Sequence, residues 1–321
     1  MRLLLTVGRY FKAKYGCKVR KIPISLNGFT CPNIDGSVAK GGCIYCKNES
    51  FSPSLALNKK DFNNFKINSR MSENPLLDLQ LKDLRDQFAH HSAFYKNEFN
   101  ISKYMVYFQS FTNTYAPLST LKVLYDKALS YKNVIGLSIG TRVDCVDDKV
   151  LDLLEGYVKE GKEIWLEYGI QSVYEDSLKL TNRGHGMEGV KELFAKTASR
   201  GIKVCAHLIY GLPNETSEMM LTSLKTILSY EVHSIKIHPL YVVKGTKLAN
   251  MYKNGEYEPI TLEAYADLIV DSMKLVPEDI MVQRLSAGVH DESLIAPLWC
   301  FDKNVQMKYI RSRLRSEGID Y

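Results

Sequence analysis

The sequence predicts an α/β fold in which parallel strands form an open, partial barrel. Short runs of apolar and β-branched residues alternate with longer amphipathic stretches along most of the chain. The expected strands cover 20–26, 103–109, 134–141, 163–171, 203–210 and 234–242. The expected helices cover 76–88, 118–129, 147–158, 187–198, 219–230 and 262–275. A helix between successive strands is typical of parallel strands joined by right-handed crossovers.

Three of the strand runs, VIGLSIG, IWLEYGI and CAHLIYGL, are apolar along almost their whole length. Strands that are buried on both faces have this composition. A closed barrel of eight units takes about 250 residues, and the stretch 20–275 contains six strand runs, which favours a partial barrel of six units. We therefore predict a basic N-terminal extension over 1–19, the barrel over 20–275 and a C-terminal extension over 276–321. A doubly wound sheet is the alternative.

Composition places the chain among globular proteins, with 45% hydrophobic and 24% charged residues in 321. The net charge of +6 permits contact with nucleic acid without requiring it. No apolar run approaches the ~20 residues of a membrane span, and the first residues lack the features of a signal peptide. We expect a cytoplasmic protein without a membrane partner. In that reducing compartment, seven cysteines indicate metal binding or catalysis rather than disulfides.

Cys31, Cys43 and Cys46 lie together in a glycine-rich loop directly after the first strand run. Soft thiolates at short spacing suit an iron–sulfur cluster or zinc. Three ligands leave one metal position open, as a reactive centre requires. A structural zinc site with Cys17 or His185 as the fourth ligand is the main alternative. Ordinary buried thiols are a further one.

The same stretch carries a resemblance to a known family. Cys43-Ile-Tyr-Cys46 is similar to the second half of the CxxxCxxC signature of radical S-adenosylmethionine (SAM) enzymes, with Tyr45 at the aromatic position. The first gap differs, because eleven residues separate Cys31 from Cys43. Further motifs follow in the same order as in the YhcC/YtqA group, whose domain resembles the radical SAM domain of the Elongator catalytic subunit. They are YFQSFTNTYAP at 107–117, IGTRVDC at 139–145, NRGH at 182–185, LIYGLPNET at 208–216 and HPLYVVKGT at 238–246.

The resemblance implies a partial (β/α)6 TIM-like barrel of the radical SAM type. It also implies that Cys31, Cys43 and Cys46 are catalytic and bind a [4Fe–4S] cluster, and that SAM chelates the fourth iron. Such a cluster cleaves SAM reductively to a 5′-deoxyadenosyl radical, which takes a hydrogen atom from the substrate. An electron donor such as flavodoxin or ferredoxin is then required.

The resemblance further implies a set of SAM-binding residues near the ends of the predicted strands. They are Gln109, Ser110, Thr112, Arg142, Asp144, Gln171, Arg183 and His207. Ordinary structural roles compete with each assignment: a polar turn for the first three and a surface ion pair for Arg142 with Asp144. His207 stands where the coproporphyrinogen oxidase-type relatives have an aspartate, and a hydrogen-bonded core histidine is its alternative. Glu167 is expected inside the barrel, either as a buried acid or paired with a neighbouring arginine.

Two basic, aromatic-bearing segments, 9–21 and 303–315, flank the barrel. In a helix, Lys308, Arg311 and Arg315 share one face, which suits phosphates or simply solvent. The Elongator-like resemblance implies tRNA as the partner. It indicates conversion of carboxymethylaminomethyl-uridine toward aminomethyl-uridine at the wobble position. The alternatives are a small metabolite such as a tetrapyrrole and a non-catalytic, zinc-stapled RNA-binding protein. The polar stretch 48–75 is expected to form a loop over the site, with an ordinary mobile surface loop as the alternative.

Overall fold

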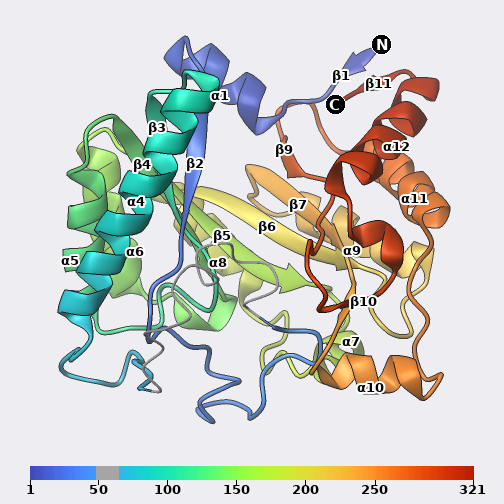
Figure 1. The fold of residues 1–321 in the computed structure, drawn as a ribbon, viewed down its shortest axis with the longest axis horizontal. Coiled ribbons are helices and arrows are strands. Elements are labelled where there is room, and N and C mark those ends of the chain that lie inside the picture. The colour runs from blue at the N-terminus through green and yellow to red at the C-terminus, as the bar shows by residue number, and fades with distance from the viewer. Residues whose placement is uncertain (48–64) are drawn as a thin grey trace.

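The computed structural model describes residues 1–47 and 65–321, and a seven-stranded parallel sheet forms its centre (Figure 1). The strands are β2 (Val19–Ile24), β3 (Lys103–Phe108), β4 (Val134–Thr141), β5 (Glu163–Gln171), β6 (Lys203–Tyr210), β7 (Ser234–Pro239) and β9 (Met281–Arg284). They pair in chain order without the reversal that defines a doubly wound sheet. The sheet curls into an open half-barrel, so the predicted partial barrel is confirmed. Its seventh strand, β9, is an addition to the six predicted units.

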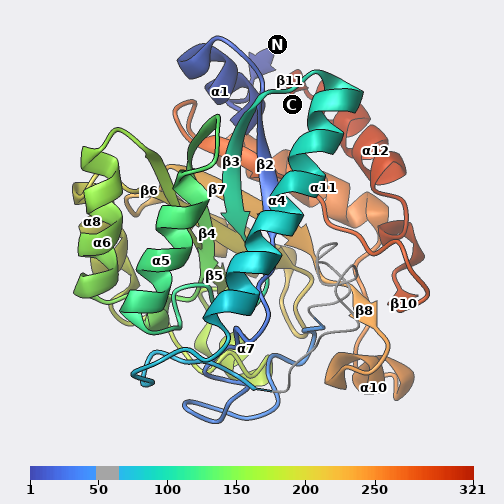
Figure 2. The ribbon, with the colours of Figure 1, turned by 60° about the vertical axis from the view of Figure 1, so that its left-hand side comes forward.

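Helices cover the convex face of this sheet (Figure 2). They are α4 (Leu77–Phe99), α5 (Leu118–Leu129), α6 (Asp148–Lys159), α8 (Val190–Ser199), α9 (Ser217–Leu228) and α11 (Leu262–Leu275). The short helix α7 (Glu175–Leu180) lies instead at the end of the barrel that is lowest in Figure 1. Side-chain oxygens of Asp147, Thr216 and Thr261 cap the amide nitrogens at the starts of α6, α9 and α11. The bounds of three strands, β4 to β6, and of two helices, α5 and α11, match the predicted ranges.

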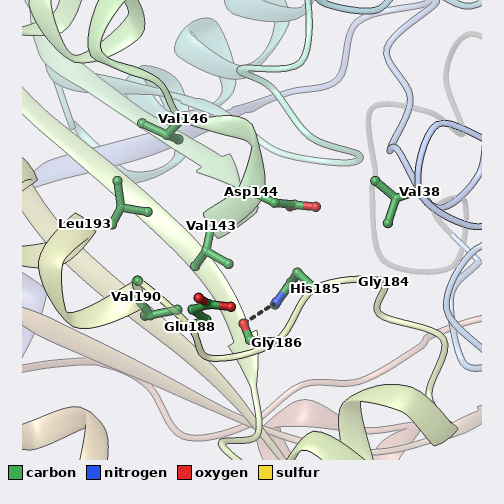
Figure 3. A pocket seen from close by; sticks show the side chains of 11 residues that line it. Val38, Val143, Asp144, Val146, Gly184, His185, Gly186, Glu188, Val190 and Leu193 are labelled. Atoms are coloured by element: carbon green, nitrogen blue, oxygen red, sulfur yellow. Dashed lines mark hydrogen bonds between the residues drawn. The ribbon is translucent and has the colours of Figure 1, made fainter.

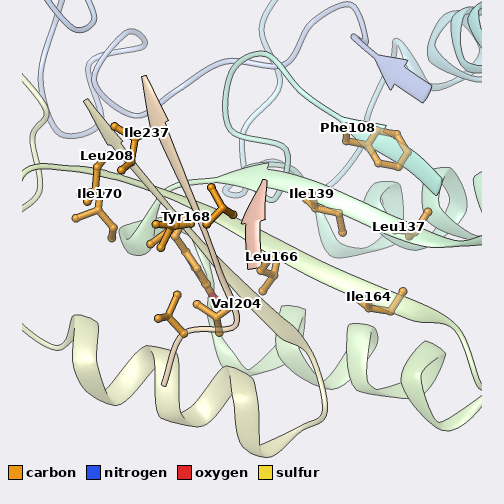
Figure 4. Close-up of a cluster of buried hydrophobic side chains, with 14 of the residues drawn as sticks. Phe108, Leu137, Ile139, Ile164, Leu166, Tyr168, Ile170, Val204, Leu208 and Ile237 are labelled. Atoms are coloured by element: carbon orange, nitrogen blue, oxygen red, sulfur yellow. The ribbon is translucent and has the colours of Figure 1, made fainter. Parts of the chain in front are cut away.

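The main apolar core lies between the sheet and these helices (Figure 4). Because successive side chains of a strand point to opposite faces, one alternate set faces the helices. That set includes Phe108, Ile139, Leu166 and Leu208, all fully buried. The other set points into the barrel lumen, and it is polar at mid-height. The fold therefore has an apolar core between the sheet and the helices and a polar lumen on the other face of the sheet.

Helix α1 (Val7–Tyr15) closes the N-terminal end of the barrel. Thr6 caps its start, and Gly16, at φ 68°, ends it in the left-handed conformation. Phe11 packs against Met105, Trp165 and Met281 at the floor of the lumen. The predicted basic extension thus contributes an apolar plug, and its cations surround the edge of that plug.

The C-terminal part extends the fold beyond the barrel. It contains β8 (Val242–Val243), α10 (Lys247–Lys253), β10 (Leu294–Ala296), α12 (Lys303–Ser316) and β11 (Ile319–Asp320). Strand β11 pairs in parallel with β1 (Arg2–Leu3), so the two ends of the described chain lie side by side (Figure 1). Of the loop predicted over 48–75, residues 48–64 lie outside the described residues. Among the helices described, none combines the length and apolarity needed to cross a membrane.

Candidate functional site

The three clustered cysteines lie in the segment that follows β2, at the C-terminal end of the strand. Active sites of parallel α/β barrels occupy this end. Cys43 is buried, Cys31 and Cys46 are half-buried, and none of the three forms a disulfide. The amide of Cys46 donates to the carbonyl of Cys43 at 3.0 Å, which forms a tight turn between the second and third thiols.

The long first gap of the cysteine motif folds into a closed side loop. The amide of Gly42 donates to the carbonyl of Asn33 at 2.7 Å, and Asp35 forms a β-bridge with Lys40 within the loop. The hydrogen bond between Asn33 and Gly42 therefore closes residues 34–41 into a loop with a narrow neck. Without these eight residues, three residues remain between Cys31 and Cys43, which is the spacing of the usual CxxxC signature.

Donor groups surround two of the sulfur atoms. Thr112 Oγ1 donates to Cys31 Sγ at 3.1 Å, and Asn33 Nδ2 donates to Cys43 Sγ at 3.2 Å. Burial raises the pKa of the Cys31 thiol to about 11, although Thr112 and Arg142 oppose this shift. Burial also opposes ionisation of Cys43, but Arg183, Asn33 and Arg142 together lower the pKa of that thiol. Such donors stabilise thiolates, the form that binds metal.

Two buried arginines supply the positive charge at this end of the barrel. Arg183 donates to the carbonyl of Gly169 at 2.6 Å and reaches Cys43 Sγ at 3.5 Å. A Cβ on Gly169 would lie 3.1 Å from the Arg183 guanidinium, so glycine gives that group its room. Arg142 forms a two-bond ion pair with Asp144, both bonds at 2.8 Å. Since the Arg142 side chain is only 3% exposed, this pair is not a surface one.

One atom of Arg142 lacks a protein partner. Its Nη1 is buried and, among the described residues, meets no acceptor. The amide oxygen of Asn113 is also buried and meets no donor among the described residues, while its amide nitrogen donates to the carbonyls of Ser110 and Gly140. Buried polar atoms normally find partners, so these two atoms indicate a polar ligand at this end of the barrel.

Strained backbone marks two strand ends beside the thiols. Ser110 and Phe111 follow β3 with φ of 72° and 57°, and Gln171 ends β5 with φ of 75°. Residues with a Cβ rarely adopt the left-handed region, and consecutive ones cost about 1–3 kcal/mol each. Gln109 precedes this turn and donates its amide to the carbonyl of Ile24 at 3.0 Å. The turns re-aim polar groups across the open end of the barrel.

Asp144 and His185 line a pocket of about 560 Å³ beside the thiols (Figure 3). Val38 of the side loop faces them, and Val143 contributes to the wall. Burial lowers the pKa of His185 to about 3, with Arg183 adding to the shift, so the imidazole is neutral. The side loop thus forms one wall of a pocket that adjoins the candidate cofactor site.

His207 lies deeper in the lumen than the other predicted contacts. Its Nε2 pairs with Glu167 Oε2 at 3.0 Å, and burial lowers the pKa of His207 to about 4. His238 lies next to it with ring centroids 5.9 Å apart, and its Nε2 is buried without a partner among the described residues. The structure groups Cys31, Cys43, Thr112, Arg142 and Arg183 around the thiols and places His207 below them.

Glu167 is the centre of a buried polar network across the lumen. Lys21 Nζ and Ser138 Oγ each donate to Oε1 at 2.5 Å, and Lys236 donates to Oε2. Its partners are therefore two lysines, where the sequence suggested an arginine. Burial opposes ionisation of Glu167, but Lys21 and Lys236 hold its pKa well below the usual range. Burial lowers the pKa of Lys236 to about 8.

Glu167, Cys205 and His207 also bring three possible metal-ligand atoms within 4.8 Å of one another. The ammonium groups of Lys21 and Lys236 already occupy the two carboxylate oxygens. They also present positive charge to any ion at that place. The arrangement is a closed ion network rather than a metal site.

Sequence reasoning missed several residues that shape the site. Asn33 bonds Cys43 and, at 2.8 Å, the carbonyl of Asn182, which fixes the cysteine segment to the loop after α7. Lys236 could have been noticed, because a lysine between isoleucines in a buried strand demands a counter-charge. Gln283, whose Oε1 accepts from Lys21 Nζ at 2.7 Å, gave no such signal. Cys17 lies before β2, at the opposite end of the strand from Cys31, so it is not placed to complete a zinc site with it.

The residues around the thiols fit an iron–sulfur cluster with a bound cosubstrate. Cys31, Cys43 and Cys46 supply three soft sulfur donors from one segment, and three ligands would leave one metal position of a cluster open. Arg142 offers a buried, unpartnered guanidinium nitrogen that suits a carboxylate. The unpartnered oxygen of Asn113 suits an ammonium group.

Comparison with known proteins gives full-length relatives. Protein YhcC of Escherichia coli K12 is 34% identical over 319 residues, covering 99% of this chain and 94% of its own. YtqA of Bacillus subtilis is 33% identical, with 98% and 90% covered. Elongator complex protein 3 of Saccharomyces cerevisiae is 32% identical over 172 residues. That match covers 52% of this chain and 30% of the yeast protein.

Solved structures and family profiles agree with these relatives. The N-terminally truncated archaeal Elp3 of Methanocaldococcus infernus superposes with a TM-score of 0.59 at 18% identity, covering 93% of this chain and 64% of that one. Residues 232–316 match the Radical_SAM C-terminal domain, and residues 38–227 match the Radical SAM superfamily. The chain therefore belongs to the radical SAM superfamily, within the group of YhcC and YtqA.

Proposed function

We propose that this radical SAM enzyme modifies the wobble uridine of tRNA, converting carboxymethylaminomethyl-uridine toward aminomethyl-uridine. The observation that carries the proposal is the similarity to Elongator complex protein 3 over about half of the chain, seen in yeast and human proteins alike. The resemblance to the Elongator catalytic subunit is also what implied an RNA substrate from the sequence. None of the described cysteines forms a disulfide, which agrees with a reducing, cytoplasmic setting that is part of the proposal.

The cofactors of the superfamily are a [4Fe–4S] cluster and SAM, which together supply one-electron radical chemistry when bound. Cys31, Cys43 and Cys46 are the proposed cluster ligands. Thr112 and Asn33 hold two of their sulfurs by hydrogen bonds. An electron donor such as flavodoxin or ferredoxin is the proposed source of the electron.

The protein's own groups would bind and orient the cosubstrate. Arg142 offers Nη1 to a carboxylate while Asp144 fixes the rest of its guanidinium. Gln109, Ser110 and the neighbouring turn present polar groups for an ammonium. Asp144 adjoins the pocket with His185 and suits ribose hydroxyls. Gln171, Arg183 and His207 complete the proposed set.

The lower part of the barrel keeps water out of the reaction space. Phe11, Trp165 and Met105 fill the floor, and the ion network around Glu167 lies above them. Exclusion of water protects reactive intermediates from side reactions. A substrate group therefore has access from the upper end or from the open side of the half-barrel.

The decisive experiment is nucleoside analysis of tRNA from a strain that lacks the gene. The proposal predicts loss of aminomethyl-uridine derivatives and accumulation of carboxymethylaminomethyl-uridine, both measured by mass spectrometry. Return of the gene restores the profile, and return of a Cys43→Ala allele does not. An unchanged profile would refute the tRNA assignment and favour the small-metabolite alternative, for which a tetrapyrrole is the first substrate to test.

A further inference from the structure

The two edges of the half-barrel carry cations that come from distant parts of the chain. Strands β2 and β9 are the edge strands of the sheet, so they border its open side. Arg20 belongs to β2, Arg284 to β9, and Lys303 begins α12. Arg311 follows two turns later on the same helix. We call these four residues the seam cations.

The seam cations flank the open side of the sheet between β2 and β9, and their charges act on one another and on shared neighbours. Although much of the Lys303 side chain is exposed, partial burial of its ammonium group lowers the pKa of Lys303 to about 8, and the charges of Arg284 and Arg20 add to the shift. Arg284 and Arg311 both act on the Tyr321 hydroxyl at the end of the chain. Thus the two basic segments predicted from opposite ends of the sequence meet here, through Arg20 of the first and Lys303 and Arg311 of the second.

The seam cations have no acidic partners. Among the residues that the structure describes, none of the four forms an ion pair. Other cations of the same two segments do: Arg9 pairs with Asp320 at 2.6 Å. Arg313 of α12 pairs with Asp267 at 2.5 Å. Cations held together against their mutual repulsion, with Arg20, Lys303 and Arg311 exposed, form an anion-binding surface.

The layout of this surface suits an extended polyanion. The four groups come from three elements and converge on no common acceptor, whereas a small phosphate needs convergent donors. Two of them lie against aromatic rings: Arg20 is 5.3 Å from the Tyr95 centroid, and Arg311 is 5.8 Å from that of Tyr321. Separated cations interleaved with aromatic rings are typical of single-stranded nucleic-acid surfaces.

The surface also adjoins the reaction space. The charges of Arg284 and Lys303 both reach His238, whose Nε2 is buried in the lumen without a partner among the described residues. Arg284 acts on His207 as well. A nucleotide held by its phosphate at the seam could therefore extend its base toward a neutral imidazole that has an unused hydrogen-bonding atom.

We infer that the seam cations bind backbone phosphates of a single-stranded segment of the RNA substrate, so that a nucleoside enters the barrel from its open side. The inference rests on the proposed tRNA function and names the surface that function would use. Each phosphate contact contributes about 0.7–0.9 to the slope of log affinity against log salt. That is about a threefold loss of affinity per contact between 50 and 200 mM salt.

The test is anaerobic fluorescence anisotropy of bacterial tRNA with the cluster-loaded enzyme across that salt range. The triple variant Arg20→Gln/Arg284→Gln/Lys303→Gln is compared with Arg313→Gln, which removes a paired cation from the same helix α12. We expect the triple variant to lose about two units of salt slope and Arg313→Gln to lose none. Since the removed charges repel one another, the melting temperature and iron content of the triple variant should equal those of the wild type.

Two results would overturn the inference, and they are distinguishable. If the wild type binds tRNA with a steep salt slope and the triple variant keeps that slope, the seam is not the RNA surface, while the proposed function stands. If the wild type shows no salt-dependent tRNA binding, the tRNA substrate and the seam surface fail together. A triple variant that matches Arg313→Gln in both slope and affinity counts as the first result.

Discussion

Replacing Glu167 by glutamine should destabilise the barrel strongly, because this carboxylate is the only acid that the described structure places among the lumen lysines. It is fully buried and bonds to Lys21, Lys236, Ser138 and His207. The substitution preserves shape but leaves two ammonium groups without their counter-charge. The side chains of Lys236 and Lys21 are 3% and 17% exposed, so water compensates little.

The expected loss is about 3–5 kcal/mol, the usual cost of removing one partner from a buried ion pair. At about 2 °C per kcal/mol for a large domain, the melting temperature should fall by roughly 6–10 °C. Calorimetry or circular dichroism of the anaerobic protein measures it. Asp148→Asn is the matched control, because Asp148 also bonds two cations, Lys196 and Arg200, but at the surface. Its melting temperature should be nearly unchanged.

A second variant tests the cause of the loss. Adding Lys236→Met to Glu167→Gln removes one of the stranded charges and should recover part of the melting temperature. Two outcomes would refute the reasoning. One is a Glu167→Gln protein that melts with the wild type, and the other is a double variant that melts below the single one.

Three further predictions concern acid, metal and the side loop. Burial lowers the pKa values of His185 and His207 from 6.5 to about 3 and about 4, so on acidification the unfolded chain binds protons before the folded protein does. The free energy of unfolding of the apo-protein should therefore be at its full value above pH 6.5 and fall toward pH 4 by about 1.4 kcal/mol per pH unit for each histidine. A urea midpoint that is flat from pH 7 to 5 would contradict this. The Cys43→Ala variant should lose SAM cleavage and most of the about four irons of the cluster. The Cys17→Ala variant, at the opposite end of β2, should keep both. Full iron content in Cys43→Ala would exclude Cys43 as a ligand. Deleting residues 34–41 closes the neck between Asn33 and Gly42 and should preserve iron content, with loss comparable to Cys43→Ala as the contrary outcome.

The barrel was predictable where local pattern and burial agree. Strand 163–171 is buried along almost its whole length, because one face meets helices and the other meets the plug and the ion network, so the run and its bounds were readable. Strand β9 was missed since it has four residues, two of them polar, and only pairing with β7 makes it a strand. An edge strand of this length is too short for the alternation of apolar and polar side chains to identify it.

The site was predictable to the level of residue types but not of partners. The spacing of the thiols indicated metal binding and the family resemblance favoured a cluster over zinc, while the neck that shortens their first gap depends on a backbone hydrogen bond between Asn33 and Gly42. Lys21 belonged to a segment read as a basic surface, and the structure places it against Glu167 in the lumen. Composition assigns such residues to solvent, because only the assembled barrel supplies their counter-charge.

The pairing of β1 with β11 sets the order in which the molecule can be completed. Arg2 aligns with Ile319, so the first strand waits for residues made more than three hundred positions later. During synthesis, Tyr10 and Tyr15 of α1 can already donate to Glu163 of β5, while the ion pair of Arg9 with Asp320 must wait for β11. Contacts of such long sequence separation form slowly. A ribosome-stalled chain that lacks 317–321 should therefore expose β1 to proteases that the chain with β11 resists.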